Sequence, residues 1–357
     1  MTNRTILIAH NYTTSTFAGM SYHLAHHLAR NGWKVIFISH RPFFRAEETF
    51  ENGNLVVTSW KTEKRPTGFD DFIHFSRIYL KYKPEVVIGH FVGGNISNVM
   101  AKVLSLGKCK TYEYYHTLTT QIKIDSGISM FKFYRKKLFY KYFVDWVLPN
   151  SEMAALDFQE NYKLKNFKSH VTPLADRYVR NKGFSRINQS LKIGFIGRLN
   201  ESKGIQVLIE VVKELNNGNF EFIVAGSGPF ERELQGIKQN NFKFLGQLEY
   251  SSVDAFISDC DLILVPSVTD NLVTVGIESL MNETLLVISS QTGLSSYLKS
   301  GEDCLIVEPN CDEIVKVLNW VNLNRNEISR IAIKGRQTYK EQFDFQTYFK
   351  FVESIIY

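Results

Sequence analysis

Twelve short apolar runs recur along this chain, and segments with helical spacing separate them. Such alternation is typical of strands and helices in parallel α/β sheets. The runs of the first half lie at 5–10, 34–39, 55–60, 85–90, 109–116 and 145–150; those of the second half lie at 191–197, 220–226, 242–246, 261–267, 284–290 and 304–309. A chain of 357 residues is too long for one ordinary core. The pattern therefore predicts an α/β protein with two Rossmann-like, doubly wound domains.

The domain boundaries follow from the same pattern. We expect a first domain over residues 1–175 and a second over 190–335, joined by a linker within 171–190 that contains the polar run RNKGFSRINQS. Residues 336–357 are rich in Phe and Tyr and should form a helix that returns to the first domain. Two such domains would face each other across a cleft, with ligands beyond the carboxyl ends of the strands.

The composition and the cysteines of the sequence indicate the cellular compartment in which the protein resides. Hydrophobic residues make up 44% and charged residues 22%, and no run of about 18 apolar residues is present. The start, MTNRTILIAH, reads as a first strand and lacks the features of a signal peptide. The four cysteines form no CxxC pair. We therefore expect a cytoplasmic protein.

Charge is distributed unevenly between the halves. Residues 1–182 carry 26 Lys and Arg against 14 Asp and Glu, and the remainder carries 16 against 22. A basic first half favours an acidic surface, a phosphate-bearing acceptor or nucleic acid. The acidic second half and the lack of a nucleic-acid-binding motif argue against nucleic acid, which we do not expect as a partner.

Two carboxylates follow the strand predicted at 261–267. Asp270 lies just past the strand end, where it can accept sugar hydroxyls, and Glu278 lies further along the next helix, where it can bind two ribose hydroxyls. Between them, the amides of Leu272, Val273 and Thr274 would bind phosphate at the helix N-terminus. The alternative is a helix N-cap at Asp270 followed by an ordinary glutamate. The pair at a strand end favours a site.

Two further loops follow predicted strands. Arg198 and Lys203 lie five residues apart after the strand at 191–197 and could neutralise a departing diphosphate in place of a metal ion; a solvated turn is the alternative. The turn that begins at Gly226, Gly-Ser-Gly-Pro, suggests a dinucleotide site, but Glu231 replaces the third glycine. That replacement weakens a nicotinamide oxidoreductase as the function.

These segments together resemble the retaining group 1 glycosyltransferases with the GT-B fold. That family carries a carboxylate, seven intervening residues and then Glu-Ala or Glu-Ser, with Asp-Asn-Leu as a common start. The resemblance implies that Asp270 binds the donor sugar, Glu278 the ribose, and Arg198 with Lys203 the pyrophosphate. The backbone that holds the phosphates would be Asn271, Leu272, Val273 and Thr274, with Gly226 at the nucleotide end.

The resemblance also covers the first half. His116 ends an apolar run and would lie near the donor sugar, although a structural histidine is an alternative and His90 competes for the role. Gly19, placed before the predicted helix MSYHLAHHLARNG, matches a family glycine that approaches the diphosphate. The family often has a second glycine where this chain has Ala18.

Two other patterns need interpretation. Asp259 and Asp261 spell the DxD pattern of metal-dependent transferases, but they precede their strand and should be structural. The segment 130–146 holds five cations among eight aromatic residues. It could lie on an anionic membrane, or it could be an amphipathic helix with its aromatic residues in the core.

The implied activity is a metal-independent, retaining sugar transfer from a nucleotide diphosphate sugar, without a cofactor. UDP-sugar is the expected donor and GDP-mannose the alternative. A saccharide or lipid-linked saccharide would be the acceptor, in bacterial surface polysaccharide or glycolipid assembly at the inner face of the membrane. The chain departs from the family pattern at Glu283, Leu285, Ser295 and Ser296. These departures motivate an alternative, a non-catalytic GT-B-fold binding or scaffold subunit.

Overall fold

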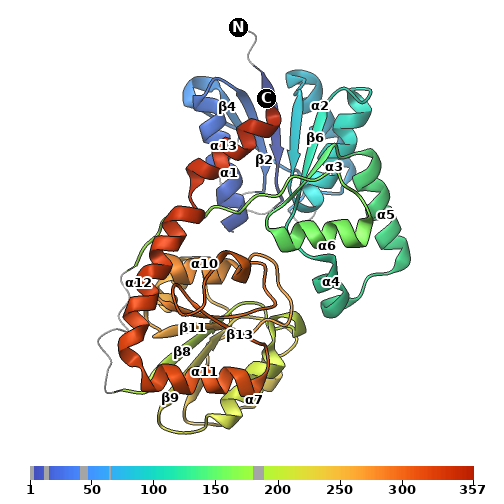
Figure 1. The fold of residues 1–357 in the computed structure, drawn as a ribbon. Coiled ribbons are helices and arrows are strands. Elements are labelled where there is room, and N and C mark those ends of the chain that lie inside the picture. The colour runs from blue at the N-terminus through green and yellow to red at the C-terminus, as the bar shows by residue number, and fades with distance from the viewer. Residues whose placement is uncertain (1–3, 12–15, 41–46, 64–65, 180–188) are drawn as a thin grey trace. The chain divides into compact units, whose positions relative to one another are not determined.

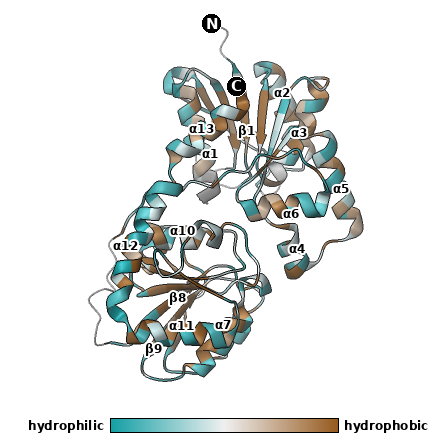
Figure 2. Ribbon diagram, in the orientation of Figure 1, coloured by the Kyte–Doolittle hydropathy of each residue, from teal (hydrophilic) through white to brown (hydrophobic). Residues whose placement is uncertain are grey.

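The computed structural model describes residues 4–11, 16–40, 47–63, 66–179 and 189–357 (Figure 1). It divides the chain into two compact units. Unit 1 comprises Met1–His116, Ile128–Thr172 and Phe345–Tyr357; unit 2 comprises Thr117–Gly127 and Pro173–Asp344. Each unit has its own sheet, and Figure 2 shows the strands as mainly hydrophobic, because helices cover them.

Unit 1 contains a seven-stranded sheet in the order β3-β4-β2-β1-β5-β6-β7. Its strands are β1 (Thr5–Ala9), β2 (Lys34–Ser39), β3 (Glu48–Phe50), β4 (Leu55–Ser59), β5 (Val86–Gly89), β6 (Lys110–Tyr115) and β7 (Trp146–Pro149). All neighbours pair in parallel except β3, which pairs antiparallel with β4 at the edge. The sequence did not predict β3, because three residues are too few for a pattern.

The helices of unit 1 are α1 (Thr16–Arg30), α2 (Phe69–Tyr82), α3 (Phe91–Leu104), α5 (Met130–Tyr142), α6 (Glu152–Tyr162) and α13 (Phe345–Ile356), with a 3-10 turn, η1 (Glu51–Gly53). Helix α13 comes from the C-terminal end of the chain and packs into this core. The hydroxyl of Tyr112 on β6 donates to the carbonyl of Ile355, and the ring of Phe349 stacks 4.0 Å from that of His27 on α1. The aromatic C-terminal helix thus completes the core of unit 1.

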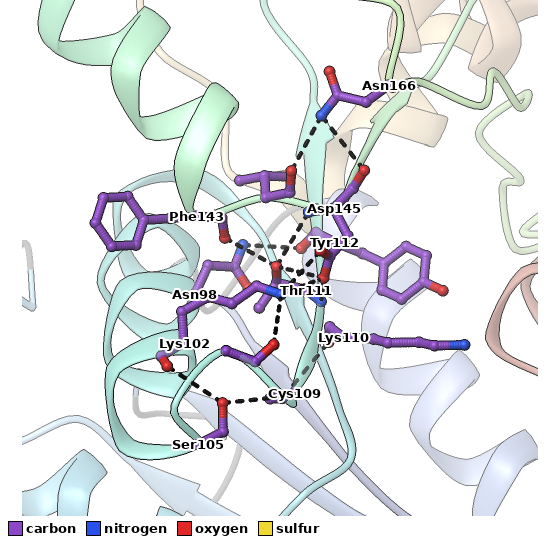
Figure 3. A network of polar contacts seen from close by, with 12 residues as sticks. Asn98, Lys102, Ser105, Cys109, Lys110, Thr111, Tyr112, Phe143, Asp145 and Asn166 are labelled. Carbon is purple, nitrogen blue, oxygen red and sulfur yellow. Dashed lines mark hydrogen bonds and ion pairs between the residues drawn. The ribbon is translucent and has the colours of Figure 1, made fainter.

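A polar network fixes the amino ends of β6 and β7 (Figure 3). The carboxylate of Asp145 accepts from the ammonium of Lys102 at 2.7 Å and from the amide of Thr111 at 2.7 Å. The Thr111 hydroxyl donates to the carbonyl of Phe143, the C-cap residue of α5. This network lies at the end of the sheet opposite the strand-to-helix loops, and it anchors the C-terminal end of α5.

Unit 2 contains a six-stranded parallel sheet in the order β10-β9-β8-β11-β12-β13. Its strands are β8 (Leu191–Ile196), β9 (Phe220–Ala225), β10 (Phe242–Phe244), β11 (Leu262–Val265), β12 (Leu285–Ser289) and β13 (Leu305–Val307). Each corresponds to one of the six apolar runs predicted for the second half. Alternate side chains of these strands form a large apolar core with α7 and α11.

The helices of unit 2 are α4 (Thr119–Ser126), α7 (Ile205–Glu214), α8 (Glu231–Gln235), α9 (Val253–Ser258), α10 (Thr274–Met281), α11 (Cys311–Leu323) and α12 (Arg325–Gln342), with 3-10 turns η3 (Glu201–Lys203), η4 (Tyr250–Ser252) and η5 (Ser295–Tyr297). No described helix is long and apolar enough to cross a membrane.

The units differ from the expected boundaries in three places. Unit 2 begins at Pro173, before both the expected end of the first domain at 175 and the expected start of the second at 190. Residues 117–127, expected in the first domain, group with unit 2, because α4 packs on η3. The expected C-terminal helix over 336–357 is divided: α12 ends at Gln342 in unit 2, and α13 begins at Phe345 in unit 1. Residues 180–188 of the expected linker lie outside the described residues.

Candidate functional site

The strand order of unit 2 reverses between β8 and β11. From β8 the chain moves outward through β9 to β10, and from β11 it moves the other way through β12 to β13. The loops that follow β8 and β11 therefore diverge at their carboxyl ends, which is where ligands bind in doubly wound sheets.

The loops after β8 and β11 touch each other. The carbonyl of Ser202 accepts hydrogen bonds from the amides of Val268 and Thr269 at 3.0 and 3.3 Å. Gly204 has a φ of +72°, and a Cβ there would lie 2.0 Å from the carbonyl oxygen of Pro266. Only glycine satisfies both the left-handed backbone and this close approach.

This contact brings together two predicted site residues. The ammonium of Lys203 pairs with Oδ2 of the buried Asp270, and Oδ1 of Asp270 accepts from the amide of Asn271 at 2.9 Å. Asp270 does not cap α10, because that helix begins at Thr274 with Val273 as its N-cap residue. The structure thus excludes the interpretation of Asp270 as a helix N-cap.

The start of α10 offers backbone donors. The amides of Leu272, Val273 and Thr274 donate no hydrogen bond to any group in the described part of the chain. Free amides and the positive end of a helix dipole favour an anion. An anion such as a phosphate bound there would adjoin the carboxylate and ammonium of the Asp270–Lys203 pair.

Glu278 is buried in α10 and bonded to a residue that the sequence did not indicate. Its Oε1 accepts from Nη2 of Arg177 at 2.9 Å, and Nε of Arg177 donates to Asp254 at 2.9 Å. No local pattern marks Arg177, which lies 101 residues from Glu278.

Arg198 and Gly226 lie on neighbouring loops. Arg198 is exposed and forms no ion pair with the described residues, so the structure does not join it to Asp270. Gly226 has a φ of +145°, and a Cβ there would lie 1.8 Å from the carbonyl oxygen of Gly197. The amide of Gly228 donates to Glu231 at 2.8 Å, so the residue in place of the third glycine occupies a donor that a dinucleotide would need.

Unit 1 carries histidines at the equivalent positions. His10, His40, His90 and His116 each directly follow a strand, namely β1, β2, β5 and β6, and all are buried. The strand order reverses between β1 and β5. Only His90 and His116 were singled out from the sequence. The signal for the other two was present, because His10 ends the apolar run at 5–10 and His40 directly follows the run at 34–39.

His90 and His116 contact each other directly. Nδ1 of His90 lies 3.0 Å from Nε2 of His116, and the hydroxyl of Ser21 lies 3.1 Å from Nε2 of His90. Burial, followed by the neighbouring histidines, lowers the pKa of both rings well below the usual value. The pair is therefore neutral near pH 7 and can exchange hydrogen bonds with uncharged groups.

Gly19 and the Asp259–Asp261 pattern lie outside the contacts described above. Gly19 lies inside α1 as its fourth residue rather than before the helix, because the helix begins at Thr16; a Cβ on Gly19 would meet nothing within 4 Å. At the amino end of β11, Asp261 accepts from the amide of Lys192 at 2.7 Å and Asp259 pairs with the Lys192 ammonium, as expected for structural residues. No group of three metal-ligating side chains occurs among the described residues.

Comparisons with known proteins agree with this architecture. A family model of glycosyl transferases group 1 matches residues 180–338, and one of glycosyltransferase family 4 matches residues 20–175. A Campylobacter jejuni GalNAc-alpha-(1->4)-GalNAc-alpha-(1->3)-diNAcBac-PP-undecaprenol alpha-1,4-N-acetyl-D-galactosaminyltransferase is 30% identical over 143 residues, 37% of this chain and 38% of that protein. An uncharacterized glycosyltransferase of Methanocaldococcus jannaschii is 21% identical over 43% of this chain and 44% of its own length. The chain thus spans less than half the length of these two curated relatives.

Solved structures match over the whole chain. A sucrose-phosphate synthase from Thermosynechococcus elongatus has a TM-score of 0.79 at 15% identity, covering 99% of this chain and 98% of that one. Anabaena Alr3699/HepE in complex with UDP-glucose has a TM-score of 0.75 at 13% identity, covering 99% of both chains. These likenesses show the fold, which is the GT-B arrangement of two Rossmann-like domains that the sequence predicted. With the two family matches, they establish that the chain belongs to the group 1 glycosyltransferase family.

Proposed function

We propose that this protein transfers a sugar from a nucleotide diphosphate sugar to a saccharide or lipid-linked saccharide acceptor, with retention at the anomeric carbon and without a metal ion. The observation that carries this proposal is the Lys203–Asp270 pair, which joins the loops after β8 and β11 beside the free amides of α10. A cation, a helix N-terminus and a carboxylate match a diphosphate and the hydroxyls of a sugar.

In the proposed reaction, a bond forms between an acceptor oxygen and the anomeric carbon of the donor. The bond from that carbon to the phosphate oxygen breaks, and its electron pair leaves with the nucleoside diphosphate. The proton of the acceptor hydroxyl passes to an oxygen of the departing phosphate, on the same face of the sugar. Lys203 and Arg198 stabilise the charge that develops on that diphosphate. Asp270 and His116 orient the donor sugar.

The remaining roles follow from positions in unit 2. The amides of Leu272, Val273 and Thr274 bind the phosphates, but the amide of Asn271, expected with them, already donates to Asp270. Gly226 lies at the nucleotide end of the site, and Glu278 binds the ribose hydroxyls. UDP is the expected nucleotide, with GDP-mannose as the alternative donor. The structurally similar HepE binds UDP and UDP-glucose, which supports this choice.

The same two strands offer a matched pair of variants for the test. Lys203→Ala removes the ion pair at the carboxyl ends of β8 and β11, and Lys192→Ala removes the Lys192–Asp259 pair at their amino ends. We expect Lys203→Ala to lower kcat on UDP-sugars by about 10²–10³-fold, the usual effect of losing one transition-state charge contact. Lys192→Ala should stay within about twofold of wild type. Equal activities of the two variants would contradict the proposed site.

The alternative of a non-catalytic subunit is tested with the same samples. A thermal-shift panel of UDP, GDP, ADP and their sugars identifies the nucleotide, since a ligand at 100 times its Kd stabilises by about 2.7 kcal/mol. Binding without turnover of any donor, in the presence of lipid-linked or free saccharides, would favour the scaffold role.

We further propose that the acceptor is reached at an anionic membrane surface, through helix α5. Phe131, Tyr134, Leu138 and Tyr142 repeat at three- and four-residue spacing on this helix, and all are exposed. The opposite face of α5 packs against unit 1 through the buried Tyr140, whose ring centroid lies 5.0 Å from that of Tyr162. The outer apolar stripe therefore lies mostly outside the core of unit 1, although the Tyr134 ring contacts that of Phe133.

The charges on α5 also favour binding to an anionic membrane surface. Residues 127–144 contain no Asp or Glu but hold five cations, of which Lys132, Arg135 and Lys141 are exposed. Apolar side chains flanked by cations bind the interface of an anionic bilayer. The Campylobacter relative acts on a polyprenol-diphosphate-linked saccharide by its name, which supports a lipid-linked acceptor.

Vesicle co-sedimentation tests this surface. The full-length protein should bind phosphatidylglycerol vesicles and not phosphatidylcholine vesicles, and binding should weaken with salt. Leu138→Ser, at 53% exposure, should reduce binding, whereas Leu80→Ser on α2, at 58% exposure, should not. Equal binding by both variants, or none by wild type, would contradict the proposed surface.

A further inference from the structure

Helix α4 comes from the first half of the sequence but belongs to unit 2. Along the chain, α4 follows β6 and precedes α5, and both of those elements belong to unit 1. Residues 117–127 nevertheless group with unit 2, which contains β8 and β11. Two of its side chains, Gln121 and Asp125, lie one turn apart and contact the loops of the candidate site.

Asp125 holds the loop after β8. Its Oδ1 accepts from the amide of Ser202 at 3.0 Å, and its Oδ2 accepts from the Ser202 hydroxyl at 3.0 Å and from Nδ2 of Asn200 at 2.9 Å. The carbonyl of Ser202 is bonded to the loop after β11. Ser202 is thus fixed on both sides, and Asp125 keeps the adjacent Lys203 in place.

Gln121 reaches the sugar-binding carboxylate itself. Its Nε2 lies 3.3 Å from Oδ1 of Asp270 and 3.3 Å from the Ser202 hydroxyl, and the side chain is only 3% exposed. Its Oε1 accepts no hydrogen bond from the described residues. A buried amide with an unused acceptor beside a carboxylate is a site that a hydroxyl group satisfies.

We propose that Gln121 is a specificity-determining residue, which selects the donor sugar by binding a hydroxyl adjacent to the one that Asp270 accepts. This inference rests on the proposed function. The carboxylate accepts from one hydroxyl, and the amide oxygen of Gln121 accepts from its neighbour. Because vicinal hydroxyls point differently in glucose, galactose and mannose, one of these configurations satisfies both groups at once. A site that hydrogen-bonds a hydroxyl discriminates strongly against a sugar that lacks it.

The test compares Gln121→Ala and Gln121→Asn with Asp125→Asn in the full-length protein. The kcat/KM values are measured with UDP-glucose, UDP-galactose, UDP-N-acetylglucosamine and GDP-mannose, and UDP affinity is measured separately. We expect Gln121→Ala to change the ratio of kcat/KM between the best donor and its epimer about tenfold, the scale of one or two hydrogen bonds. UDP, which has no sugar, should bind within about threefold of wild type. Gln121→Asn should restore part of the preference.

The Asp125→Asn variant distinguishes a residue that selects the donor sugar from one that only supports the loop after β8. Loosening the loop should weaken UDP and every UDP-sugar by the same factor and leave their ratios unchanged. If the Gln121 variants behave in that way too, Gln121 is only a structural contact and the inference is overturned. If wild type turns over donors but Gln121→Ala keeps all ratios, the inference fails while the proposed function stands. A wild type that binds no nucleotide overturns both.

Discussion

Nδ1 of His90 lies 3.0 Å from Nε2 of His116, at the carboxyl ends of β5 and β6. One ring nitrogen of such a pair must carry a hydrogen and the other must not, so at least one of the two rings is neutral. A third buried histidine, His170, packs nearby against Tyr114, with ring centroids 5.0 Å apart. Burial lowers the pKa of His170 to about 3.

These pKa shifts predict acid sensitivity of unit 1. A histidine whose pKa is lowered by folding binds protons more readily when unfolded, so stability falls as pH drops below about 6.5. Each such histidine contributes up to about 1.4 kcal/mol per pH unit down to its folded pKa. Urea unfolding between pH 7.5 and 4.5, followed by tryptophan fluorescence, measures the slope, since three of the four tryptophans, Trp33, Trp60 and Trp146, lie in unit 1.

His170→Phe provides the control for this slope. The ring already stacks on Phe351 at 5.4 Å, and its nitrogens have no hydrogen-bond partner among the described residues, so phenylalanine loses no contact of that kind. The variant should unfold with a shallower pH dependence than wild type. Identical slopes would mean that folding does not lower the pKa of His170.

Arg177→Gln should destabilise unit 2 and weaken nucleotide binding. The substitution leaves Glu278 and Asp254 without their cation, and loss of one partner of a largely buried ion pair costs about 2–3 kcal/mol or more. Arg330→Gln is the matched control, because its pair with Glu327 is exposed and should contribute under about 1 kcal/mol. Chemical denaturation and UDP titration of both variants provide the comparison.

Alanine substitutions at two glycines distinguish the cost of backbone strain from the cost of a steric clash. Gly204 and Gly246 have nearly the same φ, +72° and +71°, but only Gly204 has a neighbouring atom in the way. Gly246→Ala should cost about 1–2 kcal/mol through its left-handed backbone. Gly204→Ala, whose Cβ would overlap the Pro266 carbonyl, should cost more than about 4 kcal/mol, because the clash adds to the backbone strain. Similar Tm losses for both would show that the loop after β11 moves away.

We expect the most exposed cysteine thiol to be alkylated first and the buried thiols last. Cys311 is partly exposed, whereas Cys109, Cys260 and Cys304 are buried. Burial raises the pKa of Cys109 to about 11 and that of Cys304 further, so neither forms thiolate near pH 8. Mass spectrometry after brief iodoacetamide treatment should find Cys311 modified first, and the others only after unfolding. Early modification of Cys304 would indicate local opening around β13.

The sequence by itself determined the elements and the loops that carry chemistry. Apolar runs mark buried parallel strands because such strands are covered on both faces, and this signal is local. The runs at 191–197 and 261–267 predicted β8 and β11, and with them the loops of Lys203 and Asp270. In the first half, four of the apolar runs end at or directly before histidines, of which the sequence predicts only His90 and His116 as candidate site residues.

Only the tertiary structure decided which loops meet. The order that places β8 beside β11 depends on crossovers and packing, which leave no periodic trace in the sequence. Arg177 joins Glu278 across 101 residues, and Gln121 reaches Asp270 across 149. Neither contact has a local pattern, because each arises from buried polar groups that must find partners once distant segments are packed together.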